Sequence, residues 1–404
     1  MKKQYLILIL TFLLTVAALS ACTRVVPAPA LSDPPVTDPP DASKSAVPQF
    51  SYQWRAEGVT LYSENLTPFL LTPRGIFYCG SNFNCYDPNR GEITKVCGDA
   101  LCDHGPQSGC PFIRYMTWMD FPVCDGEALY YIDQPIDTAT GQTDEGTYVL
   151  YRSDLYGMQR KELFRSADSI EHLSLSGKKL YFEVKENEKG YRLYFFDLEN
   201  GKLEAPSGED GKGVICTLYL PVGGDVAYVS DGKLYLADAR LENASPVSEE
   251  FLYTVAFSDG SALYGIKNTV GIFRIDTETG IPTQLYSVPE GRKISFVQKS
   301  QNGISFYLQE KDAREFTNNF NELVESVPEN KVLLFSVPDG TVTDYDMGDF
   351  PAYYEVLICE NGIFANELIK SRSGGCSTTG TGWAVLSEET GWKPVKLSNE
   401  ANNQ

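Results

Sequence analysis

One short pattern recurs seven times along this chain and constrains its fold more than any other feature. Each copy is a tight turn with a glycine, followed at once by a run of apolar and aromatic residues, as in Asp125–Tyr131 (DGEALYY) and Asp259–Tyr264 (DGSALY). The glycines of the seven copies are Gly75, Gly126, Gly177, Gly224, Gly260, Gly303 and Gly362. Such turns between short β-branched and aromatic runs are the strongest local signal for a β-hairpin. The pattern therefore predicts a chain of repeated hairpins.

The spacing of these turns predicts how the hairpins assemble. Neighbouring turns lie 36 to 59 residues apart, and most are followed by a second strand pair, such as Gly271–Asp276 before its own turn at Gly280. Four-stranded repeats of this length indicate a β-propeller, because one blade cannot bury both of its faces without a neighbour on each side. We expect an all-β fold, a single β-propeller of seven blades.

Three further points about the propeller stay at the level of expectation. Six or eight blades are alternatives, because the spacing of the turns is uneven, and a pair of β-sandwiches is the alternative architecture, since alternation along strands does not distinguish the two. The segment Tyr52–Tyr62 is expected to supply the closing strand of the last blade, which would join the two ends of the ring.

The N-terminus has the pattern of a secretory signal. Lys2 and Lys3 form a basic region, and an apolar stretch from Tyr5 to Leu19 follows, too short to span a membrane comfortably. It ends in the sequence Leu-Ser-Ala-Cys at Cys22, which resembles the lipobox of bacterial lipoproteins. That resemblance implies cleavage after residue 21 and a lipid on Cys22. An ordinary cleaved signal with a cysteine nearby is the alternative.

The residues after Cys22 predict a spacer and then one folded domain. Residues 22–49 contain seven prolines among Ala, Ser, Thr, Val and Asp, a composition that cannot bury a core and is typical of a disordered, extended linker. Residues 50–404 are expected to form the propeller. The lipid on Cys22 would hold this domain on the outer face of the cell membrane, outside the cell if the bacterium is Gram-positive, with the membrane as its first partner.

Charge limits the other partners. The chain has 34 Lys and Arg against 54 Asp and Glu, a net charge of −20 at pH 7. Proteins that bind duplex nucleic acid need a basic surface. The acidic balance therefore argues against nucleic acid, and also against electrostatic binding to anionic lipid headgroups.

The cysteines are the most unusual feature of the predicted domain. Six of the ten lie between Cys79 and Cys124, and three of those share a short segment with a histidine: Cys97, Cys102, His104 and Cys110. Outside the cytoplasm such cysteines commonly form disulfides that staple a loop. Three thiols and an imidazole could instead hold zinc as a Cys3His site. Nine cysteines follow Cys22, so one would be left as a free thiol if the others paired.

The segment from Val96 to His104, VCGDALCDH, ends nearby in Cys110-Pro111-Phe112. It resembles a Cys-x4-Cys-x-His loop in propeller-like lipoproteins of clostridia and related Gram-positive bacteria. Together with the repeats, the resemblance covers nearly all of the mature chain. It implies the propeller fold and the extracytoplasmic location, but no activity, because that group has no agreed biochemical function.

Catalytic motifs are missing from the sequence. It contains no Gly-x-Ser-x-Gly elbow, no His-Glu-x-x-His and no phosphate-binding glycine loop. Of the two histidines, His172 precedes a predicted strand and is interpreted as structural. A glycoside hydrolase that uses two carboxylates, or a related surface hydrolase, stays open as the alternative, because two acidic residues suffice for that chemistry.

A non-catalytic binding or scaffolding role is the expected function. Loops on a rigid scaffold commonly carry recognition, and Trp118, Trp383 and Trp392 are candidate aromatic contacts for a protein, peptide or glycan ligand. No cofactor is expected, apart from the zinc that the cysteine segment could hold.

Overall fold

The structure is a computed structural model. It describes residues 48–55, 58–62, 69–79, 83–99, 102, 122–137, 142–144, 146–185, 190–204, 214–312, 331–347, 353–367, 369–370, 376–377 and 383–397. All of them belong to one compact unit, Ala46–Gln404, and every described hydrophobic cluster lies inside it, so this unit holds its own core. Within these ranges no helix has the length and hydrophobicity needed to cross a bilayer.

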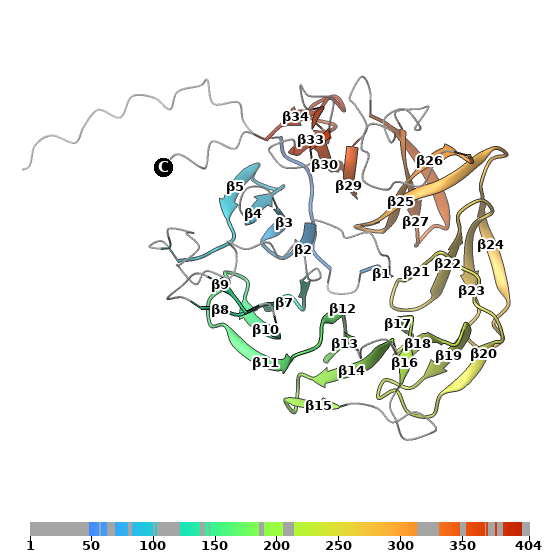
Figure 1. The fold of residues 1–404 in the computed structure, drawn as a ribbon. Coiled ribbons are helices and arrows are strands. Elements are labelled where there is room, and N and C mark those ends of the chain that lie inside the picture. Colours follow the sequence, from blue (N-terminus) through green and yellow to red (C-terminus); the bar gives the residue numbers. More distant parts are fainter. Residues whose placement is uncertain are drawn as a thin grey trace, which may run out of the picture. The chain divides into compact units, whose positions relative to one another are not determined.

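Seven four-stranded antiparallel sheets form a β-propeller, which confirms the predicted fold and blade number (Figure 1). Blade 1 contains β2 (Phe69–Thr72), β3 (Gly75–Cys79), β4 (Phe83–Asp87) and β5 (Glu92–Lys95). Blade 2 contains β6 (Val123–Cys124), β7 (Ala128–Asp133), β10 (Tyr148–Asp154) and β11 (Lys161–Ser166). Blade 3 contains β12 (Ile170–Ser176), β13 (Lys179–Lys185), β14 (Tyr191–Asp197) and β15 (Lys202–Glu204), with β16 (Ile215–Cys216) paired to β14.

The second half of the ring repeats this plan. Blade 4 contains β17 (Leu218–Val222), β18 (Asp225–Ser230), β19 (Lys233–Ala237) and β20 (Ser245–Ser248). Blade 5 contains β21 (Val255–Ser258), β22 (Leu263–Lys267), β23 (Gly271–Ile275) and β24 (Pro282–Ser287). Blade 6 contains β25 (Arg292–Ser300), β26 (Gly303–Glu310), β27 (Lys331–Ser336) and β28 (Thr341–Asp346). Blade 7 contains β29 (Tyr353–Cys359), β30 (Gly362–Glu367), β33 (Trp383–Ser387) and β34 (Val395–Lys396).

Two small hairpins accompany the blades: β8 (Ile136–Asp137) with β9 (Gln142–Thr143), and β31 (Ile369–Lys370) with β32 (Cys376–Ser377). The first strands of neighbouring blades contact one another, namely β2 with β6, β6 with β12, β12 with β17, β17 with β21, and β25 with β29. The first strand of each blade therefore faces the centre of the ring.

All seven glycines of the sequence repeat lie at the turn between the first and second strands of a blade, as predicted. In blades 1 and 6 the glycine is the first residue of the second strand and lies against the third strand. A Cβ on Gly75 would fall 2.2 Å from the carbonyl oxygen of Tyr86, and one on Gly303 would fall 1.8 Å from that of Phe335. Only glycine fits these two positions, because the obstacle is backbone rather than a flexible side chain.

Ring closure differs from the expectation. All four strands of blade 7 come from the C-terminal part of the chain, so Tyr52–Tyr62 does not supply a closing strand. Instead Phe50 and Tyr52 are buried in the hydrophobic cluster shared by blades 7 and 1. The Phe50 amide donates to the carbonyl of Pro88 at 3.0 Å, and the Tyr52 hydroxyl donates to that of Thr72 at 2.9 Å. The two ends of the ring are thus joined by an aromatic plug.

The chain then runs from this plug to the middle of the ring. There β1 (Thr60–Tyr62) pairs antiparallel with β21 of blade 5, with Thr60 opposite Ser258 and Tyr62 opposite Ala256 (Figure 1). Val59, just before it, is buried in the cluster between blades 5 and 6. The expected strand exists, but it joins a different blade because the entering chain passes inside the ring.

Candidate binding site in the central channel

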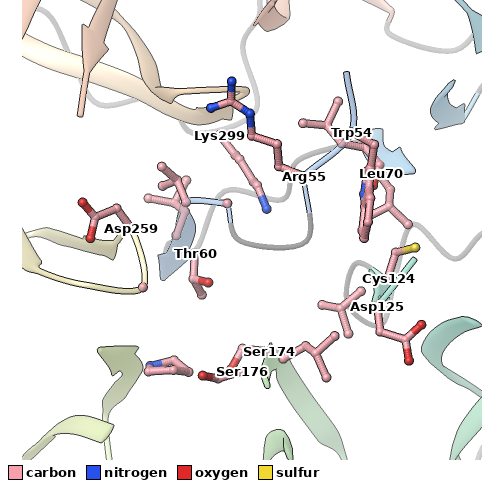
Figure 2. Close-up of a pocket in the computed structure, with 18 of the residues that line it drawn as sticks. Trp54, Arg55, Thr60, Leu70, Cys124, Asp125, Ser174, Ser176, Asp259 and Lys299 are labelled. Carbon is pink, nitrogen blue, oxygen red and sulfur yellow. The ribbon is translucent and has the colours of Figure 1, made fainter. Parts of the chain in front are cut away.

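A cavity of about 700 Å³ lies at the centre of the ring (Figure 2). We call it the central cavity; every blade contributes to its wall, with Leu70, Cys124, Ser174, Pro221, Asp259, Lys299 and Leu357 coming from blades 1 to 7 in order. The entering segment, Gln53–Arg55 and Gly58–Leu61, lines it as well. Cavities of roughly 300 to 1,000 Å³ are the usual size for small-molecule sites.

Lys299 points into this cavity because of the alternation along β25. The flanking side chains, Gln298 and Ser300, turn the other way and accept hydrogen bonds from the backbone amides of Val356 and Ile358 on β29, at 2.6 and 3.2 Å. Since successive side chains of a strand face opposite sides, Lys299 is left facing the channel, where Figure 2 shows its ammonium group.

The ammonium of Lys299 has no hydrogen bond and no ion pair with any of the residues that the structure describes. It lies beside Gly58, where an added Cβ would be 3.8 Å from Nζ. Desolvation in the interior lowers the pKa of Lys299 to about 8, and its interaction with Cys124 opposes that change. At neutral pH the group is still mostly charged, so the cavity holds a cation that forms no ion pair with a described residue.

Two further side chains of the entering segment shape the wall. The indole of Trp54 packs on the first hairpin of blade 2, where a Cβ on Gly126 would meet it at 2.6 Å, and its Nε1 donates to the carbonyl of Leu71 at 3.1 Å. Arg55 is exposed, and its guanidinium approaches the Asn302 side-chain oxygen at 3.5 Å. Trp54 is therefore fixed, while Arg55 is held by one long contact in blade 6.

The two described carboxylates of the cavity wall accept hydrogen bonds within their own hairpins. Asp125 accepts hydrogen bonds from the amide of Ala128 at 2.7 Å and from the hydroxyl of Tyr130 at 2.8 Å. Asp259 repeats this arrangement in blade 5, with the amide of Ala262 at 2.7 Å and the hydroxyl of Tyr264 at 3.2 Å. The shared sequence Asp-Gly-x-Ala-Leu-Tyr thus encodes a capped hairpin.

Hydrogen bonding also sets the charge of Asp259. Partial burial opposes its ionisation, but hydrogen bonds from the amides of Ser261 and Ala262 outweigh that effect and hold the pKa of Asp259 below its ordinary value. A carboxylate that is ionised and held in a turn is poorly suited to act as a general acid. The wall therefore offers no described pair of available carboxylates for glycoside hydrolysis.

The predicted cysteine site is only partly described. Cys97 and Cys102 pack against the cluster between blades 1 and 2, which also contains Cys85 and Cys124. Cys102 is a free thiol, so the expected disulfide does not join Cys102 to Cys97. Burial raises the pKa of Cys85 and of Cys124 to about 11, which keeps both thiols protonated and unreactive.

The remaining members of that site lie outside the described residues, as does the lipidation residue: His104, Cys110 and Cys22. Within the described ranges no group of three or more potential ligands is placed to hold a metal. The zinc interpretation of Cys97, Cys102, His104 and Cys110 therefore stays a prediction.

His172 has the surroundings of a structural residue. Its Nδ1 lies 2.7 Å from the carboxylate of Glu183, which is completely buried, and 3.2 Å from the hydroxyl of Tyr62 on β1. The thiol of Cys216 donates to the other oxygen of the same carboxylate at 3.2 Å. This cluster ties the entering strand to blade 3.

The prediction that Trp383 is an exposed contact for a ligand was wrong. Trp383 is 3% exposed and packs in the cluster between blades 7 and 1, stacked with Phe364 at 4.6 Å between ring centroids. Trp392 is 38% exposed on blade 7, away from the cavity wall, and Trp118 lies outside the described residues. The indole that does line the cavity, Trp54, was not singled out from the sequence.

Comparison with known proteins identifies no relative. No protein family matches the sequence, and no curated protein matches it. PorZ, a bacterial surface component of the type-IX secretion system of Porphyromonas gingivalis, has 11% identity and a TM-score of 0.44 over 84% of this chain and 39% of its own. The chain therefore spans about two fifths of that protein's length.

Two other solved structures are similar at the same level. An oligogalacturonate lyase from Vibrio parahaemolyticus has 12% identity and a TM-score of 0.38 over 68% of this chain and 75% of its own. TolB from Acinetobacter baumannii has 14% identity and a TM-score of 0.36 over 89% and 86%. Similarities this low transfer no ligand, activity or partner to this chain.

Proposed function

We propose that this protein is a non-catalytic binding protein that takes a small ligand into the central cavity. The observation that supports the proposal is the cavity itself: a ligand-sized hollow on a rigid seven-bladed scaffold, with a charged side chain, Lys299, pointing into it. Loops and strand ends around such a scaffold are suited to recognition because they are held in place before the ligand arrives.

The same wall disfavours a carboxylate-dependent hydrolase. Both common routes of glycoside hydrolysis need two carboxyl groups that flank one bond, about 5 to 10 Å apart. Asp125 and Asp259 belong to blades 2 and 5, and each already accepts several hydrogen bonds within its own hairpin. Each carboxylate is therefore held within the turn between the first two strands of its blade.

The location belongs to the proposal as well. The lipobox-like sequence at Cys22 and the proline-rich residues 22–49 would tether the propeller to the outer face of the membrane. A chain of that length extends to roughly 87 Å when it adopts the polyproline conformation, at about 3.1 Å per residue. The propeller could then sample ligands in the surrounding layer while it stays attached to the cell.

Ligand capture tests the binding function. Purified residues 46–404 would be mixed with a small-molecule extract of the source bacterium and its medium, separated from unbound material and denatured, and the released compounds identified by mass spectrometry. Ser176→Trp fills the cavity at the end of β12, whereas Ser245→Trp adds the same side chain to the exposed outer strand of blade 4.

We expect one compound or a small chemical group to be enriched by the unchanged protein and by Ser245→Trp, but lost with Ser176→Trp. Equal enrichment by both tryptophan variants would place binding elsewhere and contradict the proposal. Recovery of no compound from any of the three proteins would contradict it too.

A further inference from the structure

Lys299 brings a positive charge into the central cavity, where it forms no ion pair with a described residue. The cationic side chains that line the cavity are Arg55, Lys178 and Lys299, while its two described carboxylates, Asp125 and Asp259, are held by hydrogen bonds in their turns. This local excess of cations stands in a chain of net charge −20. The centre of the ring therefore differs in sign from the molecule as a whole.

We propose that the central cavity binds a molecule with one anionic group, a carboxylate or a phosphate, attached to an apolar body. The anion contacts Lys299, and the body lies against the apolar wall. This inference rests on the proposed function, because it names the ligand class of the same cavity.

The wall explains the apolar part of the ligand. Leu70 of blade 1, Leu173 and Leu175 of blade 3 and Leu357 of blade 7 line the cavity together with Leu61 of the entering strand. Such side chains bind a ligand mainly by excluding water from its apolar surface. A small inorganic anion would leave this surface uncovered.

The charge explains the anionic part. A charge that is partly withdrawn from water is costly, and an anion that binds beside it reduces this cost while it forms a charge-assisted hydrogen bond. A neutral ligand would add no charged partner for the ammonium of Lys299, and a cationic ligand would be repelled. Desolvation already lowers the pKa of this lysine, as expected for an ammonium group that is withdrawn from water.

Matched probes test the inference. Phenylacetate and phenylacetamide have nearly the same size and differ in charge, and phenyl phosphate carries the other anion. Each would be titrated into residues 46–404 at pH 7, with affinity measured by calorimetry. We expect phenylacetate to bind roughly tenfold more tightly than phenylacetamide, as a charge-assisted contact in a desolvated site predicts. The order of phenylacetate and phenyl phosphate then identifies the preferred anion.

Variants locate the effect. Lys299→Met keeps the length of the side chain but removes its charge, and should abolish the preference for phenylacetate; Lys299→Arg should retain it. Lys202→Met, on the exposed β15, removes one charge far from the cavity and should leave the preference unchanged. A folded Lys299→Met protein that still prefers the anion would overturn the inference, and so would equal binding of the two probes.

The capture experiment separates this inference from the proposed function. A captured compound that is neutral or cationic, and is lost with Ser176→Trp, would leave the binding function standing and overturn the anionic ligand class. Absence of any captured compound would remove the binding function itself. An anionic compound that is lost with Lys299→Met would support both.

Discussion

Lys299 links the binding hypothesis to the stability of the fold. Its pKa is about 8 in the folded protein against an ordinary value of 10.5. Below pH 8 the lysine is charged in both the folded and the unfolded chain, so the folded state bears the full cost of desolvation. Between pH 8 and pH 10.5 the folded lysine is neutral while the unfolded one is still protonated, so this cost disappears as pH rises.

We therefore predict that Lys299→Met stabilises the protein at neutral pH. The free energy of unfolding of the variant should exceed that of the unchanged protein at pH 7 by on the order of 1 to 3 kcal/mol, and the difference should shrink at pH 9.5. Urea unfolding of both proteins at the two pH values measures it.

Other titrating groups also change the free energy of unfolding between pH 7 and pH 9.5, but they do so in the unchanged protein and in Lys299→Met alike. Burial raises the pKa of Cys85, which does not interact with Lys299, to about 11, so ionisation of this thiol in the unfolded chain favours unfolding above about pH 9. The comparison between the two proteins removes this common effect. A Lys299→Met protein that is less stable at pH 7 would show that the ammonium has a favourable partner.

The sequence predicted the residues of the turns better than the residues of the cavity. A glycine followed by a hydrophobic run is a local signal, and Gly75 and Gly303 are required by backbone contacts within a single blade. The direction of Lys299 depends instead on Gln298 and Ser300, which bond to the neighbouring blade. A lone lysine between polar residues in a predicted strand carries no local sign that it faces a channel.

At the scale of elements, the entering segment shows how a correct local pattern led to a wrong partner. The residues from Tyr52 to Tyr62 include a real strand, β1, but it pairs with β21 of blade 5 rather than with blade 7. Strand propensity depends on context and does not name a partner. The partner is set by the plug at Phe50, which fixes where the chain enters the ring.

We predict that this plug is essential for the stability of the ring. Phe50 is 6% exposed and lies between blades 7 and 1, with its ring 6.0 Å from that of Tyr86. Phe50→Ala removes a buried aromatic side chain and should lower the free energy of unfolding by about 3 to 5 kcal/mol. Thermal or urea unfolding of residues 46–404 measures the loss.

An exposed apolar residue provides the comparison for this variant. Leu252 is 59% exposed, so Leu252→Ala should change the free energy of unfolding by less than about 0.5 kcal/mol. If Phe50→Ala were as mild as Leu252→Ala, the hydrogen bonds of the neighbouring backbone, and not the aromatic plug, would hold the two ends of the ring together.

At the scale of the whole molecule, the fold was predictable because its signal is repeated. Each of the seven turns is a weak indication by itself, but seven copies at similar spacing favour one architecture. The spacing of 36 to 59 residues was uneven, yet each described blade has four main strands. The variation is absorbed by connections and extra hairpins, such as β8 with β9 in blade 2 and β31 with β32 in blade 7.

The function was less predictable, because it depends on contacts between blades rather than on a motif. The central cavity draws one or more residues from every blade, separated by most of the length of the chain. Sequence spacing cannot reveal such a set, whereas it can reveal a compact segment like the one that contains Cys97 and Cys102. The cysteine segment that stood out in the sequence is therefore not part of the central cavity.

The proposed lipid anchor on Cys22 can be tested on the whole protein. If Cys22 carries the lipid, the protein produced in a bacterium with its own leader should fractionate with membranes, and its N-terminal peptide should begin at a diacylated Cys22. Cys22→Ser should lose the lipid, whereas Cys124→Ser should keep it, because that thiol is buried in the propeller. Mass spectrometry of the N-terminal peptide decides the matter: a mature chain that begins elsewhere, or an unmodified Cys22, would leave the propeller without this anchor.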